Sequence, residues 1–334
     1  MLGYIGRRLL QIIPLLVLLS ILIFAIIQLP PGDFVTKQVQ TLKMQGTEVA
    51  QSQIDNLRNL YNLDKPMYLQ YWFWIKNIVT KGDFGYSMAW NKPVTELIRE
   101  RFATTFVVSI LTLLLTWVVA IPIGIYSATH QYSPLDYLFT FIGFLGIAVP
   151  GFLIALVLLY LVFSKTGVAI TGLFSQQYID APLSWGKIVD GAKHIWVPVL
   201  IIGLSGTGSL IRVTRNMLLD ELSKQYVITA RSKGVPEGRL LWKYPVRIAI
   251  NPLISTIGWL LPAIISGEAL VSIVLNMPSI GPLMLLAMLN QDMYLAGSFI
   301  LVTSILTVFG TLISDILLAW FDPRIRFGTV RDGS

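Results

Sequence analysis

Long apolar stretches alternate with polar segments along the whole chain, and their lengths predict membrane-spanning helices. An α-helix rises about 1.5 Å per residue, so roughly 20 apolar residues cross the ~30 Å hydrocarbon core of a bilayer. The apolar blocks lie at about Leu9–Leu29, Thr104–Ala128, Tyr137–Phe163, Ile195–Ile211, Asn251–Leu275 and Gly297–Trp320. We therefore expect an all-α membrane protein with six transmembrane helices, organised as a single transmembrane domain over residues 1–334.

The first apolar block has features of a secretory signal, because Arg7 and Arg8 precede it. The block is longer than the usual signal core of about 7–15 residues, and no small-x-small cleavage site follows it. We expect it to be retained as the first transmembrane helix.

Two polar segments are too long to be simple hairpins between helices. Residues 31–101 are rich in charged and amide side chains, and they also carry a cluster of aromatic residues between Tyr68 and Trp74. This composition predicts a folded extramembrane insert between helices 1 and 2. Aromatic residues such as Trp72, Trp74 and Trp90 could contact a sugar or a binding protein, but we expect most of them to lie in the insert's own core. Residues 212–250, between helices 4 and 5, are basic and partly amphipathic.

The distribution of Lys and Arg predicts the orientation of the chain in the membrane. Short cytoplasmic loops carry an excess of these residues, whereas long segments are translocated largely regardless of charge. Eight Lys or Arg residues fall between Arg212 and Arg247, and further basic residues lie near both ends of the chain, at Arg7, Arg8, Arg324, Arg326 and Arg331. We expect both termini and the 212–250 loop to be cytoplasmic, and the 31–101 insert to be extracytoplasmic.

The composition supports a membrane protein and excludes several other classes. Hydrophobic residues make up 54% of the 334 residues and charged residues only 13%, about half the share in soluble proteins. The net charge of +7 is dispersed around the apolar blocks, as expected beside membrane lipid, and predicts no nucleic-acid partner. With no cysteine, the chain has no disulfides, thiolate zinc site or iron–sulfur cluster.

Candidate catalytic groups are sparse. His130 and His194 fall on opposite sides of the membrane in the expected topology, which argues against a shared metal or a Ser–His nucleophile. The sequence GLSGTGS at Gly203–Ser209 imitates a phosphate loop but lacks its lysine, so close helix packing is the better interpretation. We predict no catalytic, metal or cofactor site. Glu268 and Asp315 are the intramembrane carboxylates, for which a structural or pore-facing role is favoured over ion coupling.

The segment Tyr226–Tyr244 is the most informative part of the predicted cytoplasmic loop. Apolar residues recur at roughly helical spacing before Gly234, and Pro236 can begin a second short helix. A helix–glycine–helix element with basic flanks fits a docking device for a cytoplasmic partner. An amphipathic helix lying on anionic lipid requires the same residues, and the pattern alone leaves both interpretations open.

The ordered motifs of the chain resemble the membrane permeases of binding-protein-dependent ABC importers, specifically the dipeptide, oligopeptide and nickel group. The cytoplasmic signature of that family is similar to YVITARSKG at Tyr226–Gly234 followed by RIAINP at Arg247–Pro252. Other matching motifs are PPGD at Pro30–Asp33, LDKP at Leu63–Pro66, GDFGYS at Gly82–Ser87, PVTELIRER at Pro93–Arg101, VPGF at Val149–Phe152, QDMYLAG at Gln291–Gly297 and FDPRIR at Phe321–Arg326.

The resemblance implies a permease subunit in a bacterial or archaeal plasma (inner) membrane that forms half of a translocation path and is not itself an enzyme. The implied partners are a second homologous permease chain, two cytoplasmic subunits that bind ATP and Mg²⁺, and an extracytoplasmic solute-binding protein. The resemblance places Ala230 and Gly234 in a coupling helix and implies that they couple the permease with the ATPase. Together with the basic and apolar pattern, the predicted coupling residues are Tyr226, Ala230, Arg231, Lys233, Gly234, Arg239 and Leu241.

The chain departs from the family pattern after the fifth predicted helix. Where the family commonly has Glu-Thr-Val-Phe-x-x-Pro-Gly-x-Gly, this chain reads SIVLNMPSIG from Ser272 to Gly281, with Ser279 in place of the first glycine. The resemblance implies oligopeptides as the solute, whereas this departure weakens the assignment to peptides and leaves oligosaccharides open. The sequence does not identify the residues that contact the solute.

Two other classes of protein fit the sequence less well. A secondary carrier that works without ATPase partners is disfavoured by the sparse intramembrane charge. A membrane scaffold would not need a large cytoplasmic docking loop joined to a helical bundle with a polar lining.

Overall fold

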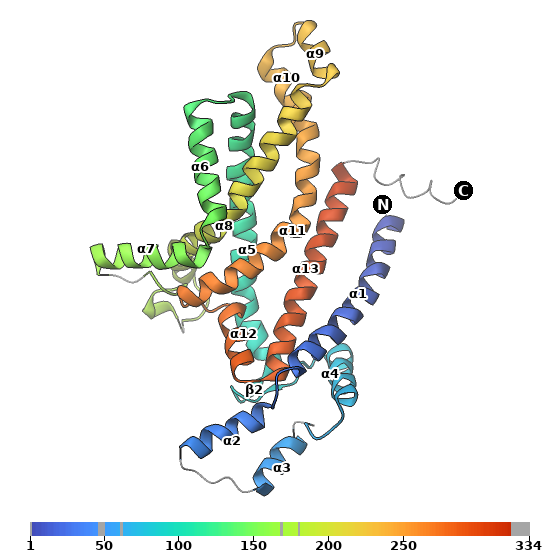
Figure 1. Ribbon diagram of the computed structural model, residues 1–334, viewed down its shortest axis with the longest axis vertical. Helices are drawn as coiled ribbons and strands as arrows, with labels where there is room; N and C mark the ends of the chain where they lie inside the picture. The colour runs from blue at the N-terminus through green and yellow to red at the C-terminus, as the bar shows by residue number, and fades with distance from the viewer. Residues whose placement is uncertain (1, 46–50, 61–62, 168–169, 180, 322–334) are drawn as a thin grey trace. The chain divides into compact units, whose positions relative to one another are not determined.

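The protein is almost entirely α-helical in the computed structural model, which describes residues 2–45, 51–60, 63–167, 170–179 and 181–321 (Figure 1). The first part of the chain forms α1 (Leu2–Gln28), α2 (Phe34–Met44), α3 (Gln51–Leu60), α4 (Met67–Lys81), a short hairpin of β1 (Tyr86–Ser87) and β2 (Lys92–Pro93), and α5 (Val94–Thr129). The remainder forms α6 (Pro134–Ala148), α7 (Gly151–Thr166), the 3₁₀ turn Gln176–Tyr178, α8 (Trp185–Leu222), α9 (Gln225–Ser232), α10 (Glu237–Lys243), α11 (Pro245–Val274), α12 (Ile280–Leu289) and α13 (Met293–Phe321).

Four helices in the described ranges are long and apolar enough to cross a membrane: Gly6–Gln28, Val94–Thr129, Trp185–Leu222 and Met293–Trp320. The number reaches six if each of two bent helix pairs counts as one span. The pairs are Pro134–Ala148 with Gly151–Thr166, and Glu237–Gly258 with Leu260–Val274. An all-helical protein with four to six candidate spans agrees with the sequence prediction at this level.

The block Tyr137–Phe163, expected to form one transmembrane helix, is instead two helices that meet at 103°. The break falls at Val149, which is extended, and at Pro150, which precedes α7. Proline cannot donate the amide hydrogen bond that would continue a helix, and it disfavours helical backbone in the preceding residue. At 15 residues, α6 is about 22 Å long, too short to cross the hydrocarbon core upright by itself.

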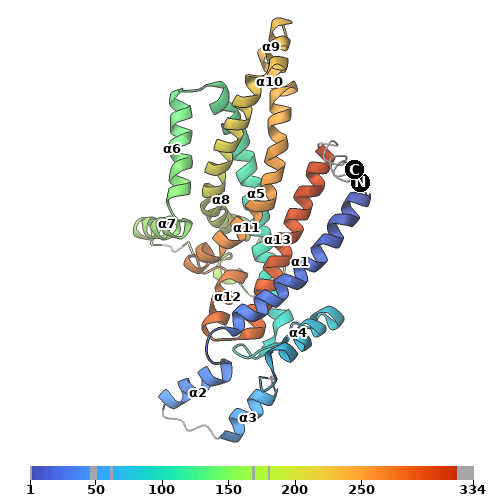
Figure 2. The ribbon, with the colours of Figure 1, turned by 45° about the vertical axis from the view of Figure 1, so that its right-hand side comes forward.

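The chain forms two compact units. Unit 1 holds Thr105–Pro278 and the described parts of Met1–Ile5 and Phe309–Ser334. Within it, the turn between α5 and α6 lies towards the same end as α9 and α10 (Figures 1 and 2). At the other end, the amide of Gly172 donates to the carbonyl of Leu275 at 2.7 Å, which ties the loop after α7 to the end of α11.

Small residues allow the helices of unit 1 to pack closely. A Cβ added at Gly208 of α8 would lie 2.2 Å from the carbonyl oxygen of Gly143 in α6, and one at Gly146 would lie 2.7 Å from that of Leu204. The segment Gly203–Ser209 is continuous helix within α8. The prediction that its glycines serve helix packing is therefore confirmed.

Unit 2 holds Gly6–Thr104 and Ser279–Val308, and its core is shared among three helices. Trp74 of α4 is buried and contacts Phe24 of α1, with ring centroids 5.6 Å apart. Both residues belong to one apolar cluster with Leu301 of α13. Trp72 is 58% exposed and lies outside this cluster, because α4 turns its opposite face towards α1 and α13.

Candidate functional site

The segment Tyr226–Tyr244 in unit 1 forms the predicted helix–glycine–helix element. Helix α9 ends at Ser232, Gly234 follows at a φ of +73°, and α10 begins after Pro236. Proline suits the start of a helix because its fixed φ is helical and its missing N–H would be unpaired there. A Cβ at Gly234 would meet no atom within 4 Å, so the left-handed backbone, rather than crowding, is what favours glycine.

A small apolar core holds α9 and α10 together. Val227, Ala230 and Leu240 are buried in it, and Val235 donates its amide to the carbonyl of Ala230 at 3.3 Å. The hydroxyl of Tyr226 donates to Glu221 at the end of α8. Burial and this carboxylate raise the pKa of Tyr226, so the phenol stays protonated and keeps its role as donor.

The predicted coupling residues divide into buried and exposed groups. Tyr226, Ala230 and Leu241 are buried or half-buried, and Leu241 packs on the cluster formed by α5, α8 and α11. The exposed group is Arg231, Lys233, Gly234 and Arg239. The first group therefore builds the element, and only the second group offers surface to a partner.

Two apolar side chains complete the exposed surface of the element. Ile228 is 44% exposed and Trp242 is 61% exposed. Neither was among the predicted coupling residues, although helical spacing places Ile228 away from the buried pair Val227 and Ala230. Arg231 is bound at this surface by the carboxylate of Glu237, with Nη2 3.2 Å from Oε2. The surface formed by Ile228, Arg231, Lys233, Arg239 and Trp242 is here called the α9–α10 surface.

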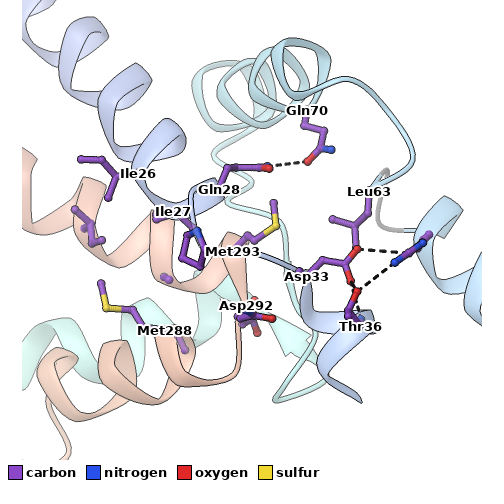
Figure 3. A pocket seen from close by; sticks show the side chains of 17 residues that line it. Ile26, Ile27, Gln28, Asp33, Thr36, Leu63, Gln70, Met288, Asp292 and Met293 are labelled. Carbon is purple, nitrogen blue, oxygen red and sulfur yellow. Dashed lines mark hydrogen bonds and ion pairs between the residues drawn. The ribbon is translucent and has the colours of Figure 1, made fainter. Parts of the chain in front are cut away.

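A cavity of about 440 Å³ lies within unit 2, between the start of the predicted insert and the α12–α13 turn (Figure 3). Its apolar wall includes Ile27, Met288 and Met293. Its polar wall carries two interactions: Gln28 donates to Gln70 at 2.9 Å, and Arg58 Nε lies 3.5 Å from Asp33 Oδ2.

Asp33 also caps α2, because its carboxylate accepts hydrogen bonds from the amide and the hydroxyl of Thr36, both at 2.6 Å. Arg58 Nη2 donates to the same hydroxyl at 3.2 Å. The cavity therefore combines amide groups, an acid–base pair and flexible Met and Ile side chains. These groups can hold a ligand with both backbone amides and apolar side chains. Sequence reasoning missed this cavity, although PPGD and QDMYLAG both contribute to its lining.

The two intramembrane carboxylates have different surroundings. Glu268 of α11 is 1% exposed and accepts a hydrogen bond from the hydroxyl of Ser272 at 2.6 Å. Asp315 of α13 is half-buried. Arg324 and Arg326, the two arginines that follow it in the sequence, lie outside the described residues. A hydrogen-bonded, buried Glu268 agrees with a structural role.

Within the described part of the chain, no group of three or more His, Asp or Glu residues is arranged to hold a metal ion. His130 stacks on Tyr126, with ring centroids 4.5 Å apart, and His194 contacts the carbonyl of Asp190 at 2.8 Å. Both histidines therefore make local contacts within their own helical segments.

Multiple apolar helices and a compact basic element between α8 and α11 define the class of the molecule: a multi-pass membrane protein with an element suited to docking. Residues 120–327 match the family "Binding-protein-dependent transport system inner membrane component", and residues 1–109 match its N-terminal counterpart, "Binding-prot-dependent transport system membrane comp, N-term". The chain belongs to this family.

Membership makes the protein an integral inner-membrane permease of an ABC importer, which implies ATPase and binding-protein partners. It is not itself catalytic, and the permease family carries no cofactor. The resemblance inferred from the ordered motifs is thereby confirmed.

Individual relatives are similar over their full lengths. The oligopeptide transport system permease protein AppB of Bacillus subtilis is 33% identical over 328 residues, covering 98% of this chain and 100% of the relative. The dipeptide transport system permease protein DppB of Alkalihalophilus pseudofirmus is 29% identical, again covering 98% and 100%. The glutathione transport system permease protein GsiC of Escherichia coli K12 is 30% identical, with the same coverage.

Proposed function

We propose that this permease forms half of the translocation path for oligopeptides in an ATP-driven importer. The observation that carries the proposal is the full-length similarity to AppB, DppB and GsiC, whose names all refer to peptide or peptide-like solutes. The mixed lining of the cavity in unit 2 supports it, since Gln28, Gln70 and the Asp33–Arg58 pair complement the amides and charged termini of a peptide.

The proposed assembly contains a second homologous permease chain, two cytoplasmic ATP-binding subunits and an extracytoplasmic solute-binding protein. In this arrangement residues 1–334 act as a single transmembrane domain with six spans and both termini in the cytoplasm. Residues 31–101 face outwards and 212–250 face the cytoplasm. The excess of Lys and Arg in the second segment supports that orientation.

In the proposed mechanism the α9–α10 surface seats on an ATPase subunit and transmits its closure to the spans. The exposed Trp242 and Ile228 supply the apolar contact, and Lys233 and Arg239 orient the partner by charge. The buried Val227, Ala230 and Leu240 make the element stiff enough to carry force. Leu241 links it to the cluster between α5, α8 and α11, which are the helices that must move.

Uptake competition in the intact importer tests the solute. Labelled tri- to pentapeptides are expected to be taken up and to be displaced by unlabelled peptides of unrelated sequence. Saturating oligosaccharide is expected to leave uptake unchanged. Inhibition by oligosaccharide but not by peptide would overturn the peptide assignment. The departure at Ser279 makes oligosaccharides the second candidate, because this buried side chain stands where the family commonly has glycine.

Pull-down and ATPase assays test the coupling surface. Trp242→Ala, which removes a large exposed side chain, is expected to weaken association of the ATPase by about tenfold or more while the permease stays folded. The control Trp196→Ala removes a tryptophan from α8 that is 53% exposed, against 61% for Trp242, and is expected to leave association unchanged. Equal ATPase association in the two variants would show that the ATPase does not bind the α9–α10 surface.

A further inference from the structure

A second cavity, of about 290 Å³, lies within unit 1 between α6, α8 and the turn before α6. Helices α6 and α8 run antiparallel beside it, because Asp136 contacts Arg215, whereas Gly143 contacts Gly208. The cavity therefore forms a groove that follows this pair of helices and has two ends. The end at Asp136 and Arg215 is polar, and the other end, which includes Ile147, is apolar.

The polar end of the groove carries two arginines, Arg212 and Arg215, but one carboxylate, Asp136. Asp136 accepts hydrogen bonds from Arg215 Nε at 3.3 Å and Nη2 at 3.2 Å, and from the amide of Tyr132 at 3.0 Å. Arg212 also lines the cavity, three residues earlier on α8 and so on the same face as Arg215. Among the described residues Arg212 makes no hydrogen bond or ion pair, and it is exposed.

The turn before α6 presents an aromatic side chain at the same end. Tyr132 has a φ of +62°, an unusual value for a tyrosine, and the hydrogen bond that its backbone N–H donates to the Asp136 carboxylate holds it there. Tyr132 and Tyr137 line the cavity and are 72% and 61% exposed. Tyrosine with a wet hydroxyl and an apolar ring is favoured at the level of lipid headgroups.

The apolar end continues along the outside of α6. Phe144 and Ile147 line the cavity and are exposed, and the floor is the backbone contact between Gly143 and Gly208. Because both positions lack a side chain, the groove is open there rather than filled. From Asp136 to Ile147 the groove follows about 16 Å of helix, enough for much of an acyl chain.

We propose that this groove binds one anionic phospholipid, with the phosphate on Arg212 and an acyl chain along Phe144 and Ile147. The charge at the polar end selects an anion, and the continuous apolar wall selects a lipid over a free phosphate. This site is separate from the α9–α10 surface and does not depend on which solute is transported. It does require this end of unit 1 to lie at a membrane surface, as the proposed topology places it.

Native mass spectrometry of the intact importer, purified in mild detergent from membranes containing phosphatidylglycerol, tests the proposal. The wild-type permease is expected to retain phosphatidylglycerol in preference to phosphatidylethanolamine. Arg212→Gln is expected to reduce this retention roughly fivefold, as expected for the loss of one cation near a lipid surface. Arg247→Gln, an exposed arginine of α11 that does not line the cavity, is the matched control and is expected to retain the lipid.

A second variant tests the apolar end without changing charge. Ile147→Trp is expected to fill the groove and reduce retention of phosphatidylglycerol, while the thermal stability of the complex stays near that of the wild type. Equal retention in Arg212→Gln and Arg247→Gln would overturn the site. Displacement of the lipid by inorganic phosphate alone would also overturn it. So would efficient crosslinking to the second permease chain from a thiol-attached photocrosslinker on Phe144→Cys, which would identify a protein as the occupant.

Discussion

At the scale of single residues, Asp292 connects two segments that lie about 200 positions apart in unit 2. Its carboxylate accepts hydrogen bonds from the hydroxyl of Ser87 at 2.6 Å, the amide of Ala89 at 3.1 Å and the amide of Leu295 at 3.3 Å. The side chain is fully buried. These hydrogen bonds join the GDFGYS and QDMYLAG motifs. They give a physical reason why both motifs occur in the same family of proteins.

Asp292 gives a pH-dependent prediction. Burial raises its pKa above the ordinary aspartate value, while the donors from Ser87, Ala89 and Leu295 oppose the shift. The folded state therefore binds the proton more tightly than the unfolded chain. The stability that this proton contributes is present below the ordinary pKa and is lost as the pH rises through the folded-state pKa. The Tm of the wild type, measured relative to that of Asp292→Asn, is therefore expected to rise as the pH falls from about 7 towards about 4.

Thermal unfolding of the purified importer at several pH values measures this difference. Asp83→Asn provides the control, because Asp83 is exposed in the same unit. A difference between wild type and Asp292→Asn that stays constant over this pH range would contradict the raised pKa.

Gly234 gives a prediction about backbone conformation. At a φ of +73° a β-branched residue is strained by roughly 1–3 kcal/mol, whereas asparagine adopts this region more readily. Gly234→Val is expected to uncouple ATP hydrolysis from uptake, and Gly234→Asn is expected to retain most coupling. The measurement is the ratio of solute transported to ATP hydrolysed in proteoliposomes. Normal coupling in Gly234→Val would show that the conformation of this turn is not needed to transmit ATPase closure to the spans.

At the scale of helices, the crossing of α6 and α8 depends on close approach of their backbones. A Cβ at Gly208 would lie 2.2 Å from the carbonyl oxygen of Gly143, so the two helices must separate to admit it. Gly208→Ala is expected to destabilise the permease by about 1–3 kcal/mol, as overpacking does. A Cβ at Gly238 of α10 meets nothing within 4 Å, so Gly238→Ala should be neutral or stabilising by up to about 1 kcal/mol.

Tm measurements in detergent compare these two glycine variants directly. A Gly208→Ala protein as stable as Gly238→Ala would mean that the two helices do not pack as described.

The α9–α10 element gives a prediction about local stability. Leu240 is fully buried between the two short helices, and its truncation to alanine is expected to cost about 2–5 kcal/mol. These helices have only 8 and 7 residues and depend on this core, since isolated helices of that length are marginal in water. Hydrogen exchange over residues 225–244 is expected to accelerate strongly in Leu240→Ala. In Ile228→Ala, whose side chain is exposed, it should change little.

At the scale of the whole molecule, the proposed orientation in the membrane can be tested by chemical labelling. The chain has no cysteine, so single cysteines can be introduced directly. An impermeant thiol reagent applied from outside is expected to label cysteines at Lys43 and Gln177, both exposed, but not at Lys224 or Arg331. Lys224 is exposed and Arg331 lies beyond the described residues. Labelling of Lys224 from outside would reverse the proposed topology and move the α9–α10 surface away from the ATPases.

Several features could be predicted because they depend on local pattern. Apolar length predicted six spans, of which the described residues show four to six candidates, since the hydrocarbon thickness sets the number of residues a helix needs. The positions of Gly234 and Pro236 identified the two short helices, because each residue restricts its own backbone. The ordered motifs identified the family.

The remaining features depend on contacts between distant segments, which no local pattern encodes. The block Tyr137–Phe163 is one apolar stretch in the sequence, and only packing determines that α6 and α7 meet at 103°. Trp72 and Trp74 are both aromatic residues of one helix, and the position of α1 decides that Trp74 alone is buried. The two cavities likewise arise where helices far apart in sequence meet. The sequence by itself therefore determined the class, the family and the location of the short helices, whereas tertiary packing decided which side chains of each element are buried and which are available to partners.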